Sequence, residues 1–135
     1  MIEAEGRDAM IVGMGTDLCE IRRVERSIER FGNRFLDRIF TTGEITYCMS
    51  KKGFAESFAA RFAAKEAGAK ALGTGISHGV SWQELEVQRT PSGKPSMHLS
   101  GRAAELARRL GVTTISLSLS HTREMALAVV VMESV

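Results

Sequence analysis

Apolar and polar positions alternate in a way that predicts strands at both ends of the chain. Residues 10–16 (MIVGMGT) form a short apolar run, and Gly13 and Gly15 within it indicate that another backbone or a ligand comes close. Residues 114–120 (TISLSLS) alternate strictly, whereas residues 125–132 (MALAVVVM) are almost continuously apolar. The continuous run predicts a central strand that is covered on both faces.

The long segment at residues 57–75 (SFAARFAAKEAGAKALGTG) repeats apolar positions at helical spacing and predicts a central helix. One row of that helix reads Phe58, Phe62, Glu66 and Lys70, so a carboxylate interrupts the apolar face. An ionised carboxylate in a half-buried position requires a charged partner or a metal ion. Lys70, four residues after Glu66, is the simplest partner, as an ion pair on the helix surface.

Shorter patterns predict the remaining elements. Helices are expected at residues 18–31 and at residues 101–110, and a further short helix is expected to begin at a capping box formed by Thr41 and Glu44. Strands are expected at residues 84–89 and 97–99, with a turn at residues 91–94 between them. Residues 47–53 are expected to form a mobile connection, and residues 121–124 a hairpin loop with His121 at a strand end. These elements predict an α+β fold in which a mainly antiparallel sheet packs against the long central helix.

Asp17 is a second candidate acidic residue, at the predicted junction of the first strand and the first helix. Glu20 follows three residues later, which is the spacing of a capping box with Asp17 as the N-cap. A carboxylate at such a junction can instead offer an oxygen to a bound cation. The sequence leaves both roles open.

The first predicted helix has a cationic side. Its arginines are Arg22, Arg23, Arg26 and Arg30. Glu25 and Glu29 flank this row, so a solvated face with salt bridges is the default interpretation. The functional alternative is a docking surface for an acidic partner, because arginine binds carboxylates and phosphates through two parallel hydrogen bonds.

Composition narrows the class of protein. A chain of 135 residues is long enough for one domain, so we expect residues 1–9 to be a non-catalytic extension and residues 10–135 to form a single domain. No apolar run approaches the roughly 20 residues that span a bilayer, and no signal peptide is recognisable, so no membrane role is expected. A net charge of +2 is too small to predict nucleic-acid binding.

The sequence contains no GxSxG, HExxH, CxxC or P-loop motif. The candidate chemistry therefore consists of Asp17 and Glu66 on different elements, with Arg61, Lys65 and Lys70 nearby. Mg²⁺ is commonly held by one or two carboxylates together with waters and substrate phosphates. This combination predicts metal-assisted chemistry on a phosphate ester.

Four segments in order carry a resemblance to a known family: GMGTDLCEIRR, FAARFAAKEAGAKALGTGI, PSGKP, and SLSLSHT with the Ala/Val-rich strand that follows. From residue 10 to residue 133 the chain resembles the holo-acyl-carrier-protein synthases, the short 4'-phosphopantetheinyl transferases. The resemblance implies the fold of that family. It also implies transfer of 4'-phosphopantetheine from coenzyme A to a serine of apo acyl carrier protein, releasing adenosine 3',5'-bisphosphate, in cytoplasmic fatty acid biosynthesis.

The same resemblance implies roles for individual residues. Asp17 and Glu66 would bind Mg²⁺, and Lys70 would reach the pyrophosphate of coenzyme A or the leaving bisphosphate. Glu66 would accept the serine proton, either directly or through a metal-bound water. The candidates for the nucleotide are Arg61, His121 and Thr122 at its phosphates and Pro95 near the adenine.

Partners follow from the resemblance as well. Carrier proteins present an acidic helix that Arg23, Arg26 and Arg30 could meet, and the family forms homotrimers with active sites between subunits. Two other interpretations of the residues remain. One is a non-catalytic module that binds acidic helices or nucleic acid through the arginine row, and the other is a metal-dependent phosphohydrolase that uses the same two carboxylates.

Overall fold

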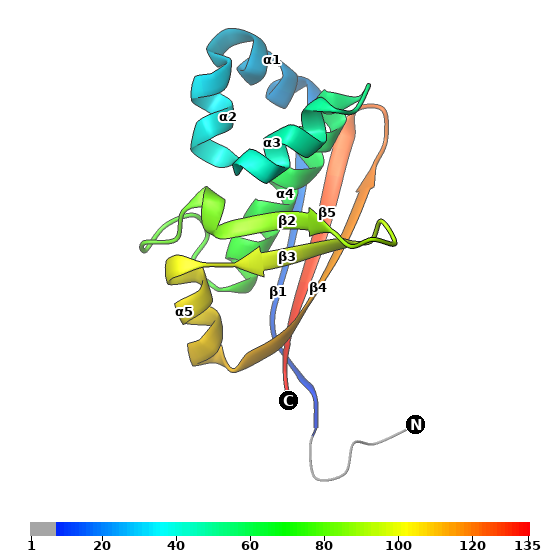
Figure 1. Cartoon of the computed structure of the whole chain (residues 1–135). Coiled ribbons are helices and arrows are strands. Elements are labelled where there is room, and N and C mark those ends of the chain that lie inside the picture. Colours follow the sequence, from blue (N-terminus) through cyan, green and yellow to red (C-terminus); the bar gives the residue numbers. More distant parts are fainter. Residues whose placement is uncertain (1–7) are drawn as a thin grey trace.

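The computed structural model describes residues 8–135, so residues 1–7 of the predicted extension lie outside the described part. Its elements are β1 (Met10–Glu20), α1 (Ile21–Phe31), α2 (Asn33–Ile39), α3 (Thr42–Met49), α4 (Phe54–Ala71), η1 (Trp82–Glu84), β2 (Leu85–Arg89), β3 (Pro95–Leu99), α5 (Gly101–Leu110), β4 (Val112–His121) and β5 (Met125–Ser134). The long strands β1, β5 and β4 run through the length of the molecule, and α1, α2 and α3 gather at one end (Figure 1).

The sheet is antiparallel and has the order β1-β5-β4, so β5 is the central strand, as its continuous apolar sequence predicts. β2 and β3 pair separately as an antiparallel hairpin. α4 packs against β1 and β5 and also contacts β2, which places it between the sheet and the hairpin. The predicted α+β architecture, with an antiparallel sheet against a long helix, is confirmed.

β1 and α4 meet backbone to backbone, which explains the two glycines in β1. A Cβ atom on Gly13 would overlap the carbonyl group of Ala71, and one on Gly15 would overlap the carbonyl group of Ala67. Only glycine allows this close approach, because any side chain would push the strand away from the helix. The expectation that another backbone comes close at these glycines is confirmed.

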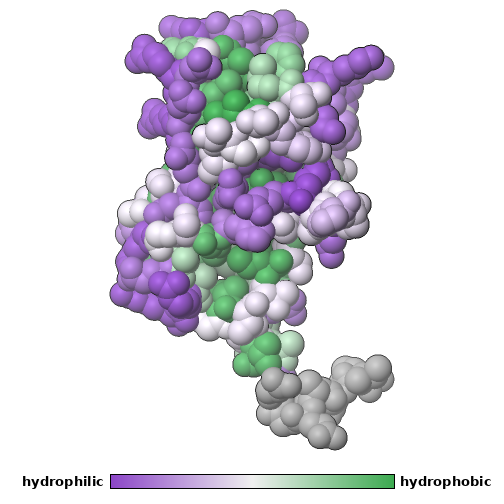
Figure 2. All heavy atoms as spheres, in the orientation of Figure 1, coloured by the Kyte–Doolittle hydropathy of each residue, from purple (hydrophilic) through white to green (hydrophobic). Residues whose placement is uncertain are grey.

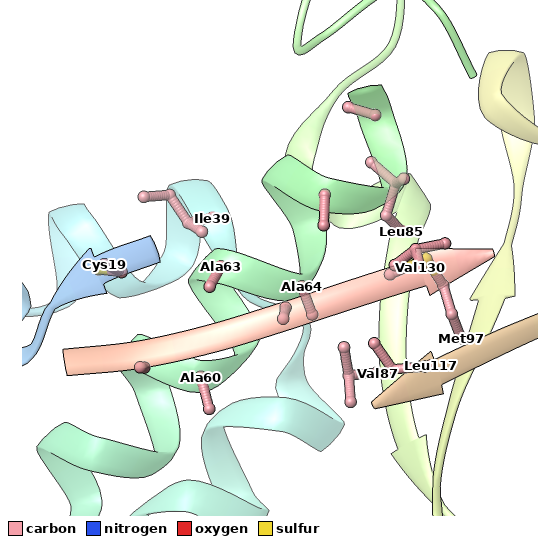
Figure 3. Close-up of a cluster of buried hydrophobic side chains, with 14 of the residues drawn as sticks. Cys19, Ile39, Ala60, Ala63, Ala64, Leu85, Val87, Met97, Leu117 and Val130 are labelled. Atoms are coloured by element: carbon pink, nitrogen blue, oxygen red, sulfur yellow. The ribbon is translucent and has the colours of Figure 1, made fainter. Parts of the chain in front are cut away.

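α4 is buried on more sides than the single apolar face that its sequence predicts. Its fully buried alanines include Ala59, Ala63, Ala64, Ala67 and Ala69. Figure 3 shows Ala64 beside β5, and Leu85 and Met97 of the hairpin next to Val130 of the same strand. Along the predicted row, Phe58 is fully buried, Glu66 is half-buried and Lys70 is exposed, so the row passes from the core to solvent. Among residues 8–135, no helix has the length and apolar character needed to cross a membrane.

Of the two helix caps predicted from the sequence, one is correct and the other is wrong. Thr41 and Glu44 form the predicted capping box, since each side chain accepts a hydrogen bond from the other residue's backbone amide. Asp17, however, caps no helix, because β1 continues past it to Glu20 and pairs Asp17 with Ala128 of β5. Pairing with the central strand therefore overrides the local capping pattern. The expected connection at residues 47–53 also starts late, because α3 extends to Met49.

A buried ion pair joins α3 to α4. Lys65 Nζ lies 2.8 Å from Glu44 Oε1, and both side chains are fully buried. Lys65 also donates hydrogen bonds to the carbonyl oxygens of Trp82 and Leu85, while Glu44 accepts one from the amide of Val87. Lys65 is therefore structural, and it ties α4 to the start of the β2–β3 hairpin.

The sheet has one covered face and one open face within a single chain. The face toward α4 includes Ala128 and Val130, which are fully buried. The opposite face exposes Met14 at 56%, Leu18 at 63% and Leu127 at 36%. The prediction that the last strand is covered on both faces is therefore wrong for one isolated chain, because α4 covers only one side of the sheet.

Candidate active site

Asp17 and Glu66 line one hollow of about 360 Å³, called here the carboxylate cavity. Asp17 comes from β1, whereas Glu66 and Lys70 come from α4. The backbone contact between the two elements lies beside these residues, because Gly15 meets Ala67, the residue after Glu66. The other lining residues are Leu18, Cys19, Glu20, Arg23, Val24, Ser27, Phe35 and Phe62.

Lys70 pairs with Asp17 and not with Glu66. Its Nζ donates hydrogen bonds to Asp17 Oδ1 at 2.9 Å and to the carbonyl oxygen of Thr16 at 3.1 Å. The predicted ion pair between Glu66 and Lys70 along the helix is wrong, because β1 lies close enough to α4 to offer a carboxylate from another element. The hydrogen bond to Asp17 and the charge of that carboxylate raise the pKa of Lys70, so its ammonium group is charged at neutral pH.

Glu66 is half-buried and forms no ion pair within residues 8–135. Burial raises the pKa of Glu66, the nearby charge of Asp17 raises it further, and Lys70 opposes both effects. The structure therefore brings two carboxylates close enough to interact and supplies one ammonium group, which is already hydrogen-bonded to Asp17. An uncompensated negative charge remains at Glu66.

These residues fit a hard divalent cation. The carboxylate cavity holds three carboxylates, Asp17, Glu20 and Glu66, against the two cations Arg23 and Lys70. Within the described residues, no cluster of three or more His, Cys, Asp or Glu side chains has metal-binding geometry. A cation here would therefore take its protein ligands from the pair Asp17 and Glu66, and waters and substrate oxygens would complete the shell, as is usual for Mg²⁺.

Arg61 and His121 line a separate, smaller hollow of about 140 Å³, called here the arginine cavity. Arg61 is 2% exposed and comes from α4, whereas His121 ends β4 and is exposed. Glu56 lies beside them, with its Oε2 3.7 Å from His121 Nδ1. Arg89 and Ser120 also line this cavity. Two arginines and a histidine around one small hollow favour an anionic ligand.

Thr122 and Pro95 are adjacent to residues of the arginine cavity but do not line it themselves. Thr122 lies in the turn between β4 and β5, where its hydroxyl accepts hydrogen bonds from the amides of Glu124 and Met125. Pro95 begins β3 and pairs with Arg89, which lines the arginine cavity. The structure therefore separates the predicted residues into two groups, and neither Thr122 nor Pro95 lines the carboxylate cavity.

The arginines of α1 are only partly grouped with this site. Arg23 lines the carboxylate cavity, whereas Arg26 and Arg30 lie on the exposed face of the helix. Hydrophilic residues gather along the edge of the molecule over α1 (Figure 2). In the part of the chain that the structure describes, no ion pair joins these arginines to Glu25 or Glu29, so their charge is not neutralised on the helix.

One neighbouring feature was not predicted. A hollow of about 700 Å³ is lined by Phe31, Arg34, Phe35, Arg38, Ile39, Phe62 and Trp82. It shares Phe35 and Phe62 with the carboxylate cavity. The sequence placed Phe62 on the apolar row of the central helix and did not indicate a groove beside it. Phe62 stacks on Trp82 at a ring distance of 4.9 Å, a contact between distant residues that no local pattern reveals.

Comparisons with known proteins agree with this geometry. The chain matches the family model of the 4'-phosphopantetheinyl transferase superfamily over residues 13–130. The holo-[acyl-carrier-protein] synthase of Koribacter versatilis is 52% identical over 124 residues, which are 92% of this chain and 99% of that protein. The crystal structure of the Neisseria meningitidis holo-[acyl-carrier-protein] synthase matches with a TM-score of 0.84 and 37% identity, covering 93% of this chain and 100% of that chain.

The crystal structure of the Helicobacter pylori holo-[acyl-carrier-protein] synthase, in complex with coenzyme A, matches with a TM-score of 0.78 and 34% identity. It covers 88% of this chain and 98% of that chain. Both the sequence and the fold are therefore matched over nearly the whole length of these relatives. The chain belongs to the holo-acyl-carrier-protein synthase family, within the 4'-phosphopantetheinyl transferase superfamily.

Proposed function

We propose that this protein transfers the 4'-phosphopantetheine arm of coenzyme A to a serine of apo acyl carrier protein and releases adenosine 3',5'-bisphosphate. Family membership supports this reaction, as does the coenzyme A bound to the Helicobacter pylori relative. The observation in this chain that carries the proposal is the carboxylate cavity, where Asp17 and Glu66 lie together and Glu66 has no ion pair within residues 8–135. The expected setting is fatty acid biosynthesis in the cytoplasm.

Asp17 and Glu66 are the residues that would hold Mg²⁺. Bound there, the ion supplies charge neutralisation for the diphosphate linkage that is broken. The chain's own residues contribute position and charge. Lys70, anchored by Asp17 at 2.9 Å, directs a permanent positive charge toward the leaving phosphate of adenosine 3',5'-bisphosphate.

The chemical step is an in-line displacement at the β-phosphorus of coenzyme A. The serine oxygen forms a bond to phosphorus, the bond from phosphorus to the bridging oxygen breaks, and the bisphosphate leaves with that oxygen. Glu66 would accept the serine proton, directly or through a water, and burial supports this role because it raises the pKa of the carboxylate and makes it a stronger base.

The arginine cavity would receive the nucleotide end of coenzyme A. Arg61 and His121 are the candidate partners for its phosphates, with Thr122 in the adjacent turn and Pro95 near the adenine. The carrier protein would dock on the unneutralised face of α1 through Arg23, Arg26 and Arg30. Such contacts are mainly electrostatic, so they weaken as salt shortens the Debye length, which is about 10 Å at 0.1 M ionic strength.

The open face of the sheet supports a homotrimer. A strand as apolar as β5 is expected to be covered on both sides, yet α4 covers only one. Met14, Leu18 and Leu127 form the exposed apolar surface that copies of this chain would cover. Light scattering on the purified protein tests this proposal: a trimer that Leu127→Lys dissociates supports it, and a monomeric parent protein contradicts it.

Mass spectrometry of the carrier tests the reaction. The protein is incubated with coenzyme A, Mg²⁺ and an apo carrier protein, and a carrier heavier by one phosphopantetheine arm is expected. Glu66→Gln should abolish the gain, whereas Glu105→Gln, an exposed carboxylate on α5, should not. Breakdown of coenzyme A with an unmodified carrier would instead indicate a phosphohydrolase. Carrier binding without either change would indicate a non-catalytic module.

A further inference from the structure

The ring of Tyr47, in α3, lies within reach of three cationic side chains. Arg61 Cζ is 4.4 Å, Lys51 Nζ 4.8 Å and Arg89 Cζ 5.5 Å from the centroid of the ring. Cations interact favourably with an aromatic face at distances up to about 6 Å. Tyr47 therefore gathers like charges that would repel one another in the absence of a bound anion.

Arg61 is the most constrained of these cations. Its side chain is 2% exposed, and its Nη1 donates one hydrogen bond, of 3.3 Å, to the carbonyl oxygen of Ser57. Its Nε is buried and has no hydrogen-bond partner within residues 8–135. A buried guanidinium group with an unused donor is unfavourable unless a ligand completes its hydrogen bonding.

The two arginines lie between the Tyr47 ring and the arginine cavity. Arg61 and Arg89 line both the arginine cavity and an adjoining hollow of about 330 Å³. Tyr47 lines only the adjoining hollow, and His121 lines only the arginine cavity. The ring thus supports the guanidinium groups from the side opposite the cavity.

Nearby carboxylates do not neutralise the arginine pair. Glu56 lines the arginine cavity, but its Oε2 lies 3.7 Å from His121 Nδ1, and no ion pair joins it to either arginine within residues 8–135. Glu86 lines the adjoining hollow and accepts hydrogen bonds from Thr41 and Gln88, and these bonds lower its pKa. Two positive charges that no carboxylate neutralises within residues 8–135 therefore line one small cavity, and Arg89 donates one hydrogen bond, from Nη1, to the carbonyl oxygen of Gly93.

We propose that Tyr47 is a positioning residue that holds Arg61 and Arg89 side by side, and that Arg89 is a second binding residue for a terminal phosphate group. The inference rests on the proposed function, in which the arginine cavity receives the nucleotide end of coenzyme A. Coenzyme A carries a diphosphate linkage and one separate phosphomonoester on its ribose. A phosphomonoester is a terminal dianion with three free oxygens, which suits a pair of guanidinium groups.

Substrates with and without the ribose phosphate separate this role from a general structural one. Arg89→Ala is expected to raise KM for coenzyme A about tenfold, the effect of losing one charge-assisted hydrogen bond, with kcat unchanged. KM for 3'-dephospho-coenzyme A should be the same as in the parent protein. Tyr47→Leu removes the ring and should raise KM for coenzyme A by about 5- to 10-fold, again without an effect on the dephosphorylated substrate.

Two further variants act as controls. Tyr47→Phe keeps the aromatic ring and should keep the parent KM. Lys51→Ala removes a cation that faces the same ring but lines neither hollow, and it too should keep the parent KM. The inference is overturned if Tyr47→Phe is as impaired as Tyr47→Leu, if both substrates lose affinity equally, or if Arg89→Ala has no effect.

Direct binding keeps this inference separate from the proposed reaction. Calorimetry with adenosine 3',5'-bisphosphate should show about tenfold weaker binding to Arg89→Ala, and 3'-dephospho-coenzyme A should bind the parent and the variant equally. An inactive parent protein that still shows this difference contradicts the transfer reaction but supports the phosphate site. An active parent protein that binds adenosine 3',5'-bisphosphate no more tightly than Arg89→Ala does supports the transfer reaction but contradicts the phosphate site.

Discussion

Replacing Lys65 with methionine is the sharpest test of how this fold is held together. Lys65 and Glu44 form an ion pair of 2.8 Å between fully buried side chains. Methionine has a similar shape, so the change removes the charge and its hydrogen bonds with little loss of packing volume. Glu44 then remains as a buried carboxylate that keeps its hydrogen bonds from the amides of Thr41 and Val87 but has lost its counter-ion.

The expected loss follows from breaking one side of a buried pair, which costs about 3–5 kcal/mol. Burial lowers the pKa of Lys65, and the charge of Glu44 opposes that effect, so the Glu44 carboxylate stabilises the charged form of Lys65. The double variant Glu44→Gln with Lys65→Met leaves no buried charge, and the single amide oxygen of glutamine can still accept a hydrogen bond from one of the two backbone amides, Thr41 or Val87. It should therefore be more stable than Lys65→Met alone, with a coupling free energy of about 2 kcal/mol.

Urea unfolding followed by circular dichroism measures these differences, at one protein concentration because subunit association also contributes to stability. Glu105→Gln is the matched control, since the Glu105 side chain is 43% exposed and forms its ion pairs with the partly exposed Arg102 and Arg109. Its loss should stay below about 1 kcal/mol. A loss below about 1 kcal/mol for Lys65→Met, or a double variant equal to the sum of the singles, would refute the reasoning.

Three other changes test the site more directly. Gly15→Ala should destabilise the protein by about 1–3 kcal/mol or more and abolish transfer, because the Cβ of the new alanine would overlap the carbonyl group of Ala67. Gly43→Ala is the control in urea unfolding, because a Cβ atom at that position meets only ordinary contacts. Glu66→Gln should raise the urea midpoint at pH 7 without magnesium, because the raised pKa of Glu66 means that its ionisation destabilises the folded state. The gain should vanish below about pH 4.3, where the carboxyl group is protonated in both the folded and the unfolded state, and a lower midpoint at pH 7 would contradict this. Arg26→Glu should raise KM for the carrier protein severalfold, most clearly at low salt, with KM for coenzyme A unchanged; equal carrier affinity at all salt concentrations would argue against docking on α1.

Local patterns predicted much of the fold because they act over a few residues. Strict alternation at residues 114–120 and the apolar run at 125–132 correspond to β4 and β5, and the Thr41–Glu44 spacing corresponds to a real capping box. Each of these signals comes from a period of two or from a single helical turn. The glycines of β1 were also interpretable, because a strand with two glycines needs a close neighbour.

Errors arose where a distant element decided the outcome. The capping pattern at Asp17 was overridden by pairing with Ala128, more than a hundred residues later in the chain. Lys70 found its carboxylate on β1 and not one turn back on its own helix. Local propensities cannot anticipate such choices, because they depend on which elements pack together.

In the candidate site, too, some residues could be predicted from the sequence and others could not. The sequence singled out Glu66 because a carboxylate interrupts an apolar helical row, and Asp17 because it stands at the predicted junction of a strand and a helix. The structure places both in one cavity. It did not indicate Arg89 or Tyr47, since an exposed arginine at the end of a strand and a tyrosine in a short helix are ordinary features on their own. Their arrangement around Arg61 exists only after three separate elements have folded together.

The contact between β1 and α4 carries a consequence for how this protein can change over evolutionary time. Where layers of side chains separate the elements that carry the reacting groups, repacking those layers shifts the reacting groups relative to one another. Here main-chain atoms at Gly15 and Ala67 touch directly, beside both acidic groups. This main-chain contact limits how far β1 can move relative to α4, so substitutions elsewhere in the core have little room to change the spacing of the two elements that carry Asp17 and Glu66.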